Sequence, residues 1–288
     1  MIRSMTGYGT AERAGDDVRI VAEVRTVNNR YFKASLRLPD GLGGLEARLE
    51  GLLRETISRG TVTVSVTVEP RGAAARVPVN TEILEAYRRD LEAVAPAVSD
   101  DALLALPGVV GAEEGRLTGI EDLPGQVEVV IREALEDLNR MRDIEGQATA
   151  NDMATALDDI EHHIAAITER APQVVHDYGK RLHERVQAML EGVEIVLDDP
   201  SLAREIAFFA ERSDINEELA RLGSHVQQFR DVFATSGPAG RRFEFIAQEM
   251  YREVNTIGSK ANDAGLSHDA VEIKIRVDRL REQAQNVE

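Results

Sequence analysis

Acidic, basic and imidazole side chains in the last quarter of the sequence are spaced so that they would share one face of a helix. Asp214, Glu218, Arg221 and His225 follow one another at intervals of four, three and four residues. Residues three or four apart lie on the same face of an α-helix. A packed helix does not require this combination of side chains, so we interpret this face as a candidate active site.

A second group of acidic side chains follows further along the chain. Glu249 and Glu253 are four residues apart, with Arg252 beside them. If their helix faces the helix that carries Glu218 and His225, four potential metal ligands converge. The sequence contains no cysteine, so any metal must be bound by oxygen or histidine ligands.

This set of side chains suits the cleavage of a phosphodiester. That reaction needs a cation at the phosphate, a group that orients or deprotonates the nucleophile, and neutralisation of developing negative charge. Carboxylate oxygens suit Mg²⁺ or Mn²⁺, and a neighbouring histidine slightly favours Mn²⁺. The same spacing is also typical of surface ion pairs, which stabilise a helix by only about 0.3–0.5 kcal/mol each.

Several of these residues also have structural interpretations. Asp214 can cap a helix that begins near Ile215, and His225 can be a capping or core-edge histidine. Lys260 follows Gly258, so it is expected in a turn from which it reaches a phosphate, or in a plain loop. The remaining histidines, among them the adjacent pair at 162 and 163, are expected to be solvated.

The strand and helix patterns predict an α+β protein with a small strand-rich N-terminal domain. Residues 18–27 and 61–68 alternate between two faces, as strands do. Leucines at a helical period between residues 42 and 53 predict a helix between these strands. From residue 81 onward the pattern is helical, and we divide the chain at 1–80, 81–200 and 201–288.

The segment from about 126 to 192 has a long apolar stripe at mixed three- and four-residue spacing. It predicts one long helix, or an antiparallel pair broken near Ala171-Pro172. An extended apolar stripe must be covered, so the segment is expected to be a helical arm, a coiled-coil-like hairpin or a subunit interface, which makes a homo-oligomer plausible.

The net charge of −17 is unevenly distributed over the 288 residues. Lysine, arginine, aspartate and glutamate give +3 for residues 1–80, −17 for 81–200 and −3 for 201–288. The two ends are therefore able to present local basic patches to a phosphate backbone. The sequence has no apolar run of roughly 18 residues and no signal peptide, so we expect a cytoplasmic protein.

Three cations flank Asn28-Asn29, which are expected to form a turn at the tip of a hairpin. Arg25, Arg30 and Lys33 could contact an RNA backbone there or simply increase solubility. Aromatic residues make up only 4% of the chain, too few to suggest a base-stacking platform.

Three segments of the sequence resemble the YicC/YloC family of bacterial proteins. They are the opening Met1-Ile-Arg-Ser-Met-Thr-Gly-Tyr-Gly, the segment Glu23-Val-Arg-Thr-Val-Asn-Asn-Arg-Tyr-Phe, and the long run from Asp214 to Asn286. The resemblance implies an endoribonuclease that requires a divalent metal ion.

We therefore predict a metal-dependent endoribonuclease that uses Mn²⁺ or Mg²⁺. The predicted metal ligands or acid–base groups are Glu218, His225, Glu249 and Glu253. The predicted RNA-binding cations are Arg25, Arg30, Lys33, Arg221, Arg252 and Lys260. Two alternatives remain: an RNA-binding adaptor without activity of its own, which needs the cations but not the carboxylates, and a structural oligomerisation protein, which binds no RNA.

Overall fold

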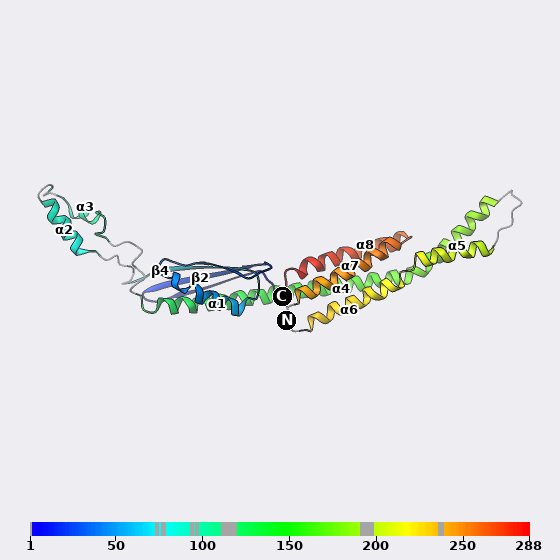
Figure 1. The fold of residues 1–288 in the computed structure, drawn as a ribbon, viewed down its shortest axis with the longest axis horizontal. Coiled ribbons are helices and arrows are strands. Elements are labelled where there is room, and N and C mark those ends of the chain that lie inside the picture. Colours follow the sequence, from blue (N-terminus) through cyan, green and yellow to red (C-terminus); the bar gives the residue numbers. More distant parts are fainter. Residues whose placement is uncertain are drawn as a thin grey trace. The chain divides into compact units, whose positions relative to one another are not determined.

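A computed structural model describes most of the chain, and its residues form two compact units. The described residues are 2–72, 75, 79–92, 95, 98–110, 120–190, 199–235 and 239–288 (Figure 1). One unit contains Met5–Arg142, and the other contains Met1–Ser4 with Asp143–Glu288. The α+β class is confirmed, while the division at residues 80 and 200 stays a prediction.

The unit formed by Met5–Arg142 is built on a four-stranded sheet in the order β1-β2-β4-β3. Strands β1 (Gly7–Ala14), β2 (Val18–Val27) and β4 (Thr61–Pro70) pair antiparallel. Strand β3 (Lys33–Arg37) pairs with β4 in parallel. The strands expected at 18–27 and 61–68 are confirmed.

Alternation along the strands buries one face of this sheet. On β2, Val18, Ile20, Ala22 and Val24 are buried. Helix α1 (Glu46–Thr56), preceded by the short 3₁₀ helix Gly43–Leu45, crosses between the parallel strands β3 and β4 and contributes its buried leucines to the same core. The strand–helix–strand prediction is therefore confirmed.

The expected hairpin at Asn28-Asn29 is wrong. The segment does connect β2 to β3, but β4 lies between these two strands and pairs with both. Turn residues in a sequence predict that the chain reverses direction, but they do not show which strands pair. The pairing depends on the apolar faces that the strands bury together.

The first part of the long helix α4 (Leu123–Leu190) completes the core of this unit. Strand β1 approaches it closely at Gly9, where an added Cβ would overlap the carbonyl oxygen of Ala134 and the backbone of Leu138. The unit also contains α2 (Thr81–Glu92) and α3 (Asp100–Leu104). The helical pattern expected after residue 81 is confirmed.

Helix α4 continues through Pro172, so the prediction of one long helix is confirmed and the alternative, an antiparallel pair broken near Ala171-Pro172, is wrong. Ile167 and Val174 on either side of the proline are buried in one core, which holds the helix on course although proline removes a backbone hydrogen bond. Helix α5 (Asp199–Arg212) packs back against the end of α4, where Tyr178 and Phe209 stack with ring centroids 3.7 Å apart.

In the second unit, three helices pack around the later part of α4. They are α6 (Asn216–Phe233), α7 (Gly240–Lys260) and α8 (Ala264–Ala284), and they lie side by side in Figure 1. The two chain ends meet here, because Arg3 and Glu288 exchange backbone hydrogen bonds of 3.1 and 2.9 Å. Within the described ranges, no helix has the apolar length that a membrane span requires.

Candidate active site

Helix α6 begins with a polar turn that orients the first candidate residues. The carboxylate of Asp214 accepts hydrogen bonds from the backbone N–H and the side-chain amide of Asn216, at 3.0 and 2.8 Å. Asp214 was expected to be the N-cap residue, but Ile215 occupies that position. Asp214 therefore supports the start of the helix from the residue before the N-cap. Glu217 and Glu218 lie in the first turn, where the helix dipole favours negative charge.

Glu218, which is buried, and Lys260, which is partly exposed, form an ion pair between α6 and α7. The Lys260 Nζ donates to Glu218 Oε1 and to the carbonyl oxygen of Asp214, both at 2.8 Å. Burial alone would raise the pKa of Glu218, but the hydrogen bond from Lys260, a backbone hydrogen bond and the lysine charge outweigh it, and the pKa lies below its ordinary value. Glu218 is therefore an anion at neutral pH, and Lys260 lies at the end of α7 and not in a loop.

Arg221 and Glu253 form the next contact between these helices. Glu253 is only 9% exposed, and its Oε1 lies 3.9 Å from Nη1 of Arg221. Arg221 also forms an ion pair with Glu217, one turn earlier on α6. The guanidinium thus lies between two carboxylates.

His225 and Glu249 lie one helical turn further along. The antiparallel register set by the Arg221–Glu253 contact places residue 225 of α6 at the level of residue 249 of α7. The His225 Nδ1 is buried and has no hydrogen-bond partner in the described part of the chain. Glu249 Oε1 accepts a hydrogen bond of 2.6 Å from Arg252.

The structure therefore brings the candidate residues together along one α6/α7 face, but not as a four-ligand cluster. We call this set the α6/α7 site; it consists of Glu218, Arg221, His225, Glu249, Arg252, Glu253 and Lys260. Each of its three carboxylates contacts a cation. Among the described residues, no group of three or more histidine, aspartate or glutamate side chains is close enough to hold a metal ion.

A metal site formed by these side chains alone is therefore not present in this arrangement. The donor types are those that Mn²⁺ and Mg²⁺ accept, but the geometry does not fit, since the carboxylates are directed at arginine and lysine. We accordingly derive no catalytic step that passes through a metal ion.

The three candidate cations near the sheet belong to the other unit. Arg25 lies 3.8 Å from Glu23 and over the ring of Tyr8, 5.0 Å from its centroid. Arg30 lies over the exposed ring of Tyr31 at 5.3 Å, and Lys33 is exposed at the start of β3. All three are accessible to a ligand.

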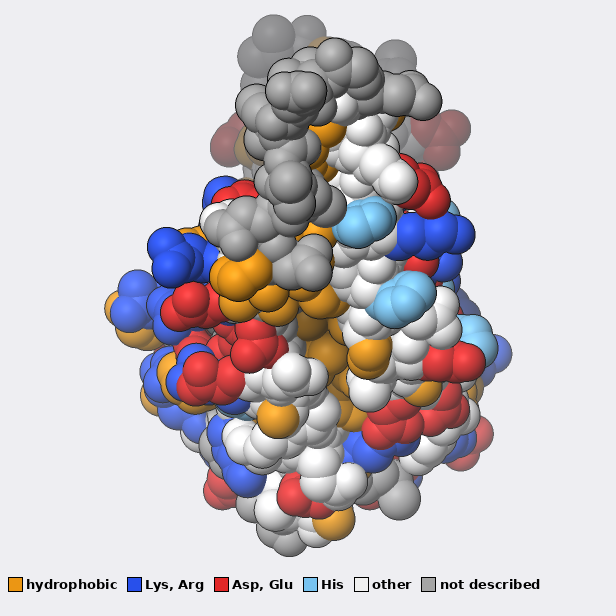
Figure 2. All heavy atoms as spheres, turned by 90° about the vertical axis from the view of Figure 1, so that its right-hand side faces the viewer, with side chains coloured by type: hydrophobic (Ala, Val, Ile, Leu, Met, Phe, Trp, Pro, Cys, Tyr) orange, Lys and Arg blue, Asp and Glu red, His pale blue; other side chains and the backbone are white. Residues whose placement is uncertain are grey.

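Charges of both signs are intermixed on the face shown in Figure 2, with hydrophobic side chains between them. The described residues drawn in this view form no continuous basic surface, so an RNA bound to them would depend on individual cations.

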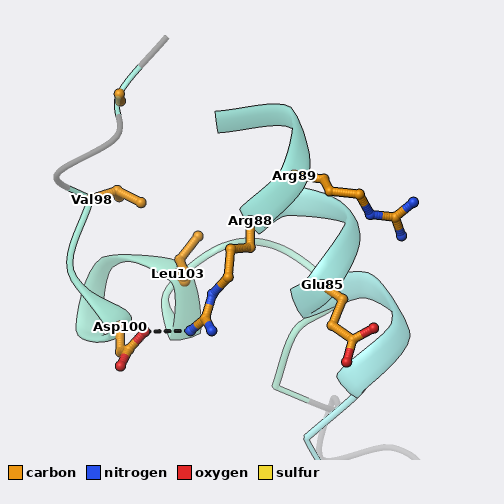
Figure 3. Close-up of a pocket in the computed structure, with 7 residues that line it drawn as sticks. Glu85, Arg88, Arg89, Val98, Asp100 and Leu103 are labelled. Carbon is orange, nitrogen blue, oxygen red and sulfur yellow. Dashed lines mark hydrogen bonds and ion pairs between the residues drawn. The ribbon is translucent and has the colours of Figure 1, made fainter. Parts of the chain in front are cut away.

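One pocket, near α2 and α3, offers little for catalysis. It has a volume of about 550 Å³ and is lined by Glu85, Arg88, Arg89, Ala95, Val98, Asp100 and Leu103. Figure 3 shows Arg88 directed at Asp100, 2.5 Å away, while Arg89 points away from this pair. Its central arginine is thus neutralised by the carboxylate beside it.

His163 and Asp263 make long-range contacts in the helical unit that sequence reasoning missed. His163, which was expected to be solvated, is largely buried, and its Nδ1 lies 2.9 Å from Asp269 of α8. Asp263 accepts the N–H groups of Gly265 and Leu266 at the start of α8 and pairs with Arg170 of α4. The cap could have been recognised from Asp263 preceding the helix, but nothing local indicates partners about a hundred residues away.

Comparison with known proteins identifies the family. The family described as "Endoribonuclease YicC-like, N-terminal region" matches residues 2–151, and "Endoribonuclease YicC-like, C-terminal" matches residues 167–288. The chain belongs to the YicC-like family.

Two relatives of this YicC-like chain match along their whole length. One from Clostridioides difficile (strain 630) is 31% identical over 300 residues, and one from Haemophilus influenzae (strain ATCC 51907 / DSM 11121 / KW20 / Rd) is 31% identical over 294 residues. Both alignments cover 100% of this chain and 100% of the relative, and both relatives are named "Probable endoribonuclease YicC". The resemblance inferred from the sequence is confirmed.

Proposed function

We propose that this protein is an endoribonuclease that cleaves RNA phosphodiester bonds at the α6/α7 site. The names of its relatives support the activity. The location is supported above all by His225, whose Nδ1 is buried without a hydrogen-bond partner among the described residues. His225 lies at the level of Glu249, next to the contact between Arg221 and Glu253. A structural histidine would normally have both ring nitrogens satisfied by protein or solvent.

The reaction requires two proton movements around the phosphate. The attacking oxygen, of water or of a ribose 2′-hydroxyl, loses a proton to a base, and the leaving 5′-oxygen gains one from an acid. Glu249 and His225 are suited to these steps, because a carboxylate and an imidazole lie at one level of the two helices. In this proposal, Arg221 and Arg252 neutralise the charge that develops on the phosphate. Both are paired with carboxylates in the structure, so each would exchange part of that contact for the phosphate.

Glu218 has a different role in this proposal. Its pKa is lowered and its carboxylate is bound to Lys260, so it is not suited to donate a proton. It positions Lys260 at one end of the site, where the ammonium contacts the RNA backbone. Glu253 is held beside Arg221 and orients that guanidinium.

Dependence on Mn²⁺ or Mg²⁺ remains part of the proposal because carboxylate and imidazole are donor types that these ions accept. To bind such an ion, the carboxylates would have to exchange their arginine and lysine partners for it. We also propose that Arg25, Arg30 and Lys33 of the sheet unit contact the RNA backbone. Each such contact should contribute to a binding affinity that falls as the salt concentration rises.

The experiment is RNA cleavage by the purified protein with Mg²⁺, with Mn²⁺ and with a chelator, beside an RNA-binding assay. Wild type is compared with Glu249→Gln, Glu253→Gln and the matched control Glu282→Gln, which changes an exposed glutamate of α8. We expect cleavage to require the metal and to be lost in Glu249→Gln and reduced in Glu253→Gln, while RNA binding persists.

A different result would favour the adaptor. Binding of RNA by the wild type without any cleavage, or equal cleavage by the wild type and the two site variants, would remove the enzymatic role of the α6/α7 site. Cleavage that survives the chelator would instead remove only the metal dependence.

A further inference from the structure

Two arginines at the start of α7 differ from the other arginines of the neighbouring helices. Arg242 donates a hydrogen bond of 2.8 Å to the hydroxyl of Thr235, and Arg241 has no ion pair in the described part of the chain. Every other arginine of α6, α7 and α8 pairs with a carboxylate: Arg221, Arg230, Arg252, Arg276, Arg279 and Arg281. Among the described residues, Arg241 and Arg242 therefore lack a carboxylate partner, and their positive charge is available to an external anion.

These arginines line a pocket together with an exposed aromatic ring. The pocket has a volume of about 410 Å³ and is lined by Gln228, Asp231, Arg241, Arg242, Phe245 and Ile246. Phe245 is 67% exposed, although Phe243 two residues earlier is fully buried. Asp231 is the acidic residue of this lining, and its Oδ1 is occupied by a hydrogen bond from Gln227 at 2.9 Å.

The pocket continues the face that carries the α6/α7 site. On α6, Gln228 follows His225 by three residues; on α7, Phe245 precedes Glu249 by four. Residues at these spacings lie on the same face of a helix, one turn or about 5.4 Å apart. A single strand of RNA lying along this face can therefore occupy both places.

We infer that this pocket binds a nucleotide of single-stranded RNA adjacent to the cleaved phosphate. The base stacks on Phe245, and the flanking phosphates contact Arg241 and Arg242. An aromatic face accepts any base, and guanidinium forks match phosphate oxygens. Bases in a duplex cannot stack on a side chain in this way, so the pocket selects unpaired RNA. This inference rests on the proposed function.

The test measures kcat and KM for cleavage of a fluorescently labelled, unstructured RNA oligonucleotide by the full-length protein. Phe245→Ala should raise KM about tenfold, as expected from loss of one base–aromatic stack, with kcat within a few-fold of wild type. Phe245→Tyr retains the ring and should restore KM. Val271→Ala, which removes an exposed apolar side chain from α8, serves as the control and should behave like wild type.

The two arginines are tested separately, through KM and the salt dependence of RNA affinity. Arg241→Gln combined with Arg242→Gln should raise KM and lower the dependence of log affinity on log salt by about 0.7 for each phosphate that the variant no longer neutralises. Arg279→Gln, an exposed but ion-paired arginine of α8, should leave that slope unchanged.

Three outcomes would overturn the inference. If wild type cuts RNA while Phe245→Ala and the arginine variant match their controls, the subsite is absent although the proposed function stands. A change in sedimentation of Phe245→Ala that accounts for its loss of activity would make the pocket a contact between copies of the chain. If wild type neither binds nor cuts RNA, the proposed function itself fails, and the subsite fails with it.

Discussion

Asp263 and Glu218 show how one cation sets the charge of a carboxylate in this protein. The hydrogen bond from Arg170, then two backbone N–H groups at the start of α8, hold the pKa of Asp263 well below its ordinary value against the effect of burial. Burial acts to raise the pKa of Glu218, but the hydrogen bond and charge of Lys260, with a backbone hydrogen bond, lower it below its ordinary value. Both carboxylates are therefore anions whose partners come from another helix. Glu218 joins the consecutive helices α6 and α7, whereas Asp263 joins the start of α8 to α4, about ninety residues earlier in the sequence.

Asp263 should contribute stability that depends on pH. Because its folded pKa is lowered, the contribution is complete above the unfolded value of about 4 and is lost as the pH falls below it. Asp263→Ala should reduce the free energy of unfolding at pH 7 by about 1 kcal/mol through loss of the cap. Urea unfolding followed by circular dichroism checks this, and the difference from wild type should shrink between pH 4 and more acidic values. Asp263→Asn keeps a capping oxygen, so an equal loss in that variant would contradict the cap.

The Glu218–Lys260 pair should behave as a unit. Lys260→Met leaves the buried Glu218 carboxylate without its cation and should cost about 1–3 kcal/mol of unfolding free energy. Glu218→Gln in the same chain should recover part of that loss, because the uncompensated charge is removed. A double-mutant cycle of unfolding free energies measures the coupling. Strictly additive losses would show that the pair does not couple α6 to α7.

At the scale of elements, local patterns predicted strands and helices, and packing decided how they join. The alternation of Val18, Ile20, Ala22 and Val24 specifies β2 because one face of the sheet is buried. The order β1-β2-β4-β3 was not predictable from such patterns, because it depends on partners far away in the sequence. At Pro172, packing instead overrides the local pattern. Proline normally breaks a helix, but the buried residues on both sides of Pro172 keep α4 continuous.

Gly9 should be required for the contact between β1 and α4. A side chain here would overlap the backbone of Ala134 and Leu138, neither of which can move without disturbing the helix. Gly9→Ala should therefore lower the free energy of unfolding by about 2 kcal/mol, as overpacking does. Thermal unfolding of the full chain is the measurement.

Gly51 provides the matched control for this prediction. It lies in α1 with open space around its Cβ position, so Gly51→Ala should stabilise the protein by about 0.5–1 kcal/mol through helix propensity. A destabilisation of similar size by both substitutions would indicate a general intolerance of these sites and not a specific contact at Gly9.

The candidate site was predictable as residue types but not as an arrangement. Helical spacing correctly placed Glu218, Arg221 and His225 on one face of α6. It could not show that Lys260 reaches Glu218 or that Arg221 faces Glu253, because those distances depend on how α6 packs on α7. Instead of forming the expected four-ligand cluster, Glu218 and Glu253 pair with cations of the facing helix, and Glu249 pairs with Arg252 on its own helix.

For the whole molecule, exposed apolar side chains on the long helices support self-association. Met189 at the end of α4 and Phe208 on α5 are 72% and 56% exposed. An extended apolar stripe such as that of α4 must be covered, and exposed apolar side chains at its end are candidates for a contact between copies of the chain. We predict that the protein forms a homo-oligomer and that Phe208→Asp combined with Met189→Asp lowers its mass in sedimentation equilibrium. The control is His183→Asp on the same helix, where an exposed polar residue is replaced. An unchanged mass in the double variant would move the interface elsewhere.

Single-turnover cleavage of RNA by wild type and Glu249→Gln tests most directly whether the α6/α7 site performs the reaction. With enzyme in excess over a labelled RNA, the rate constant reports the chemical step free of product release. We predict that Glu249→Gln lowers it by about 10²–10⁴-fold, the usual contribution of a general base or acid, while RNA affinity stays within a few-fold of wild type. Equal rate constants for the two proteins would contradict the assignment of this site.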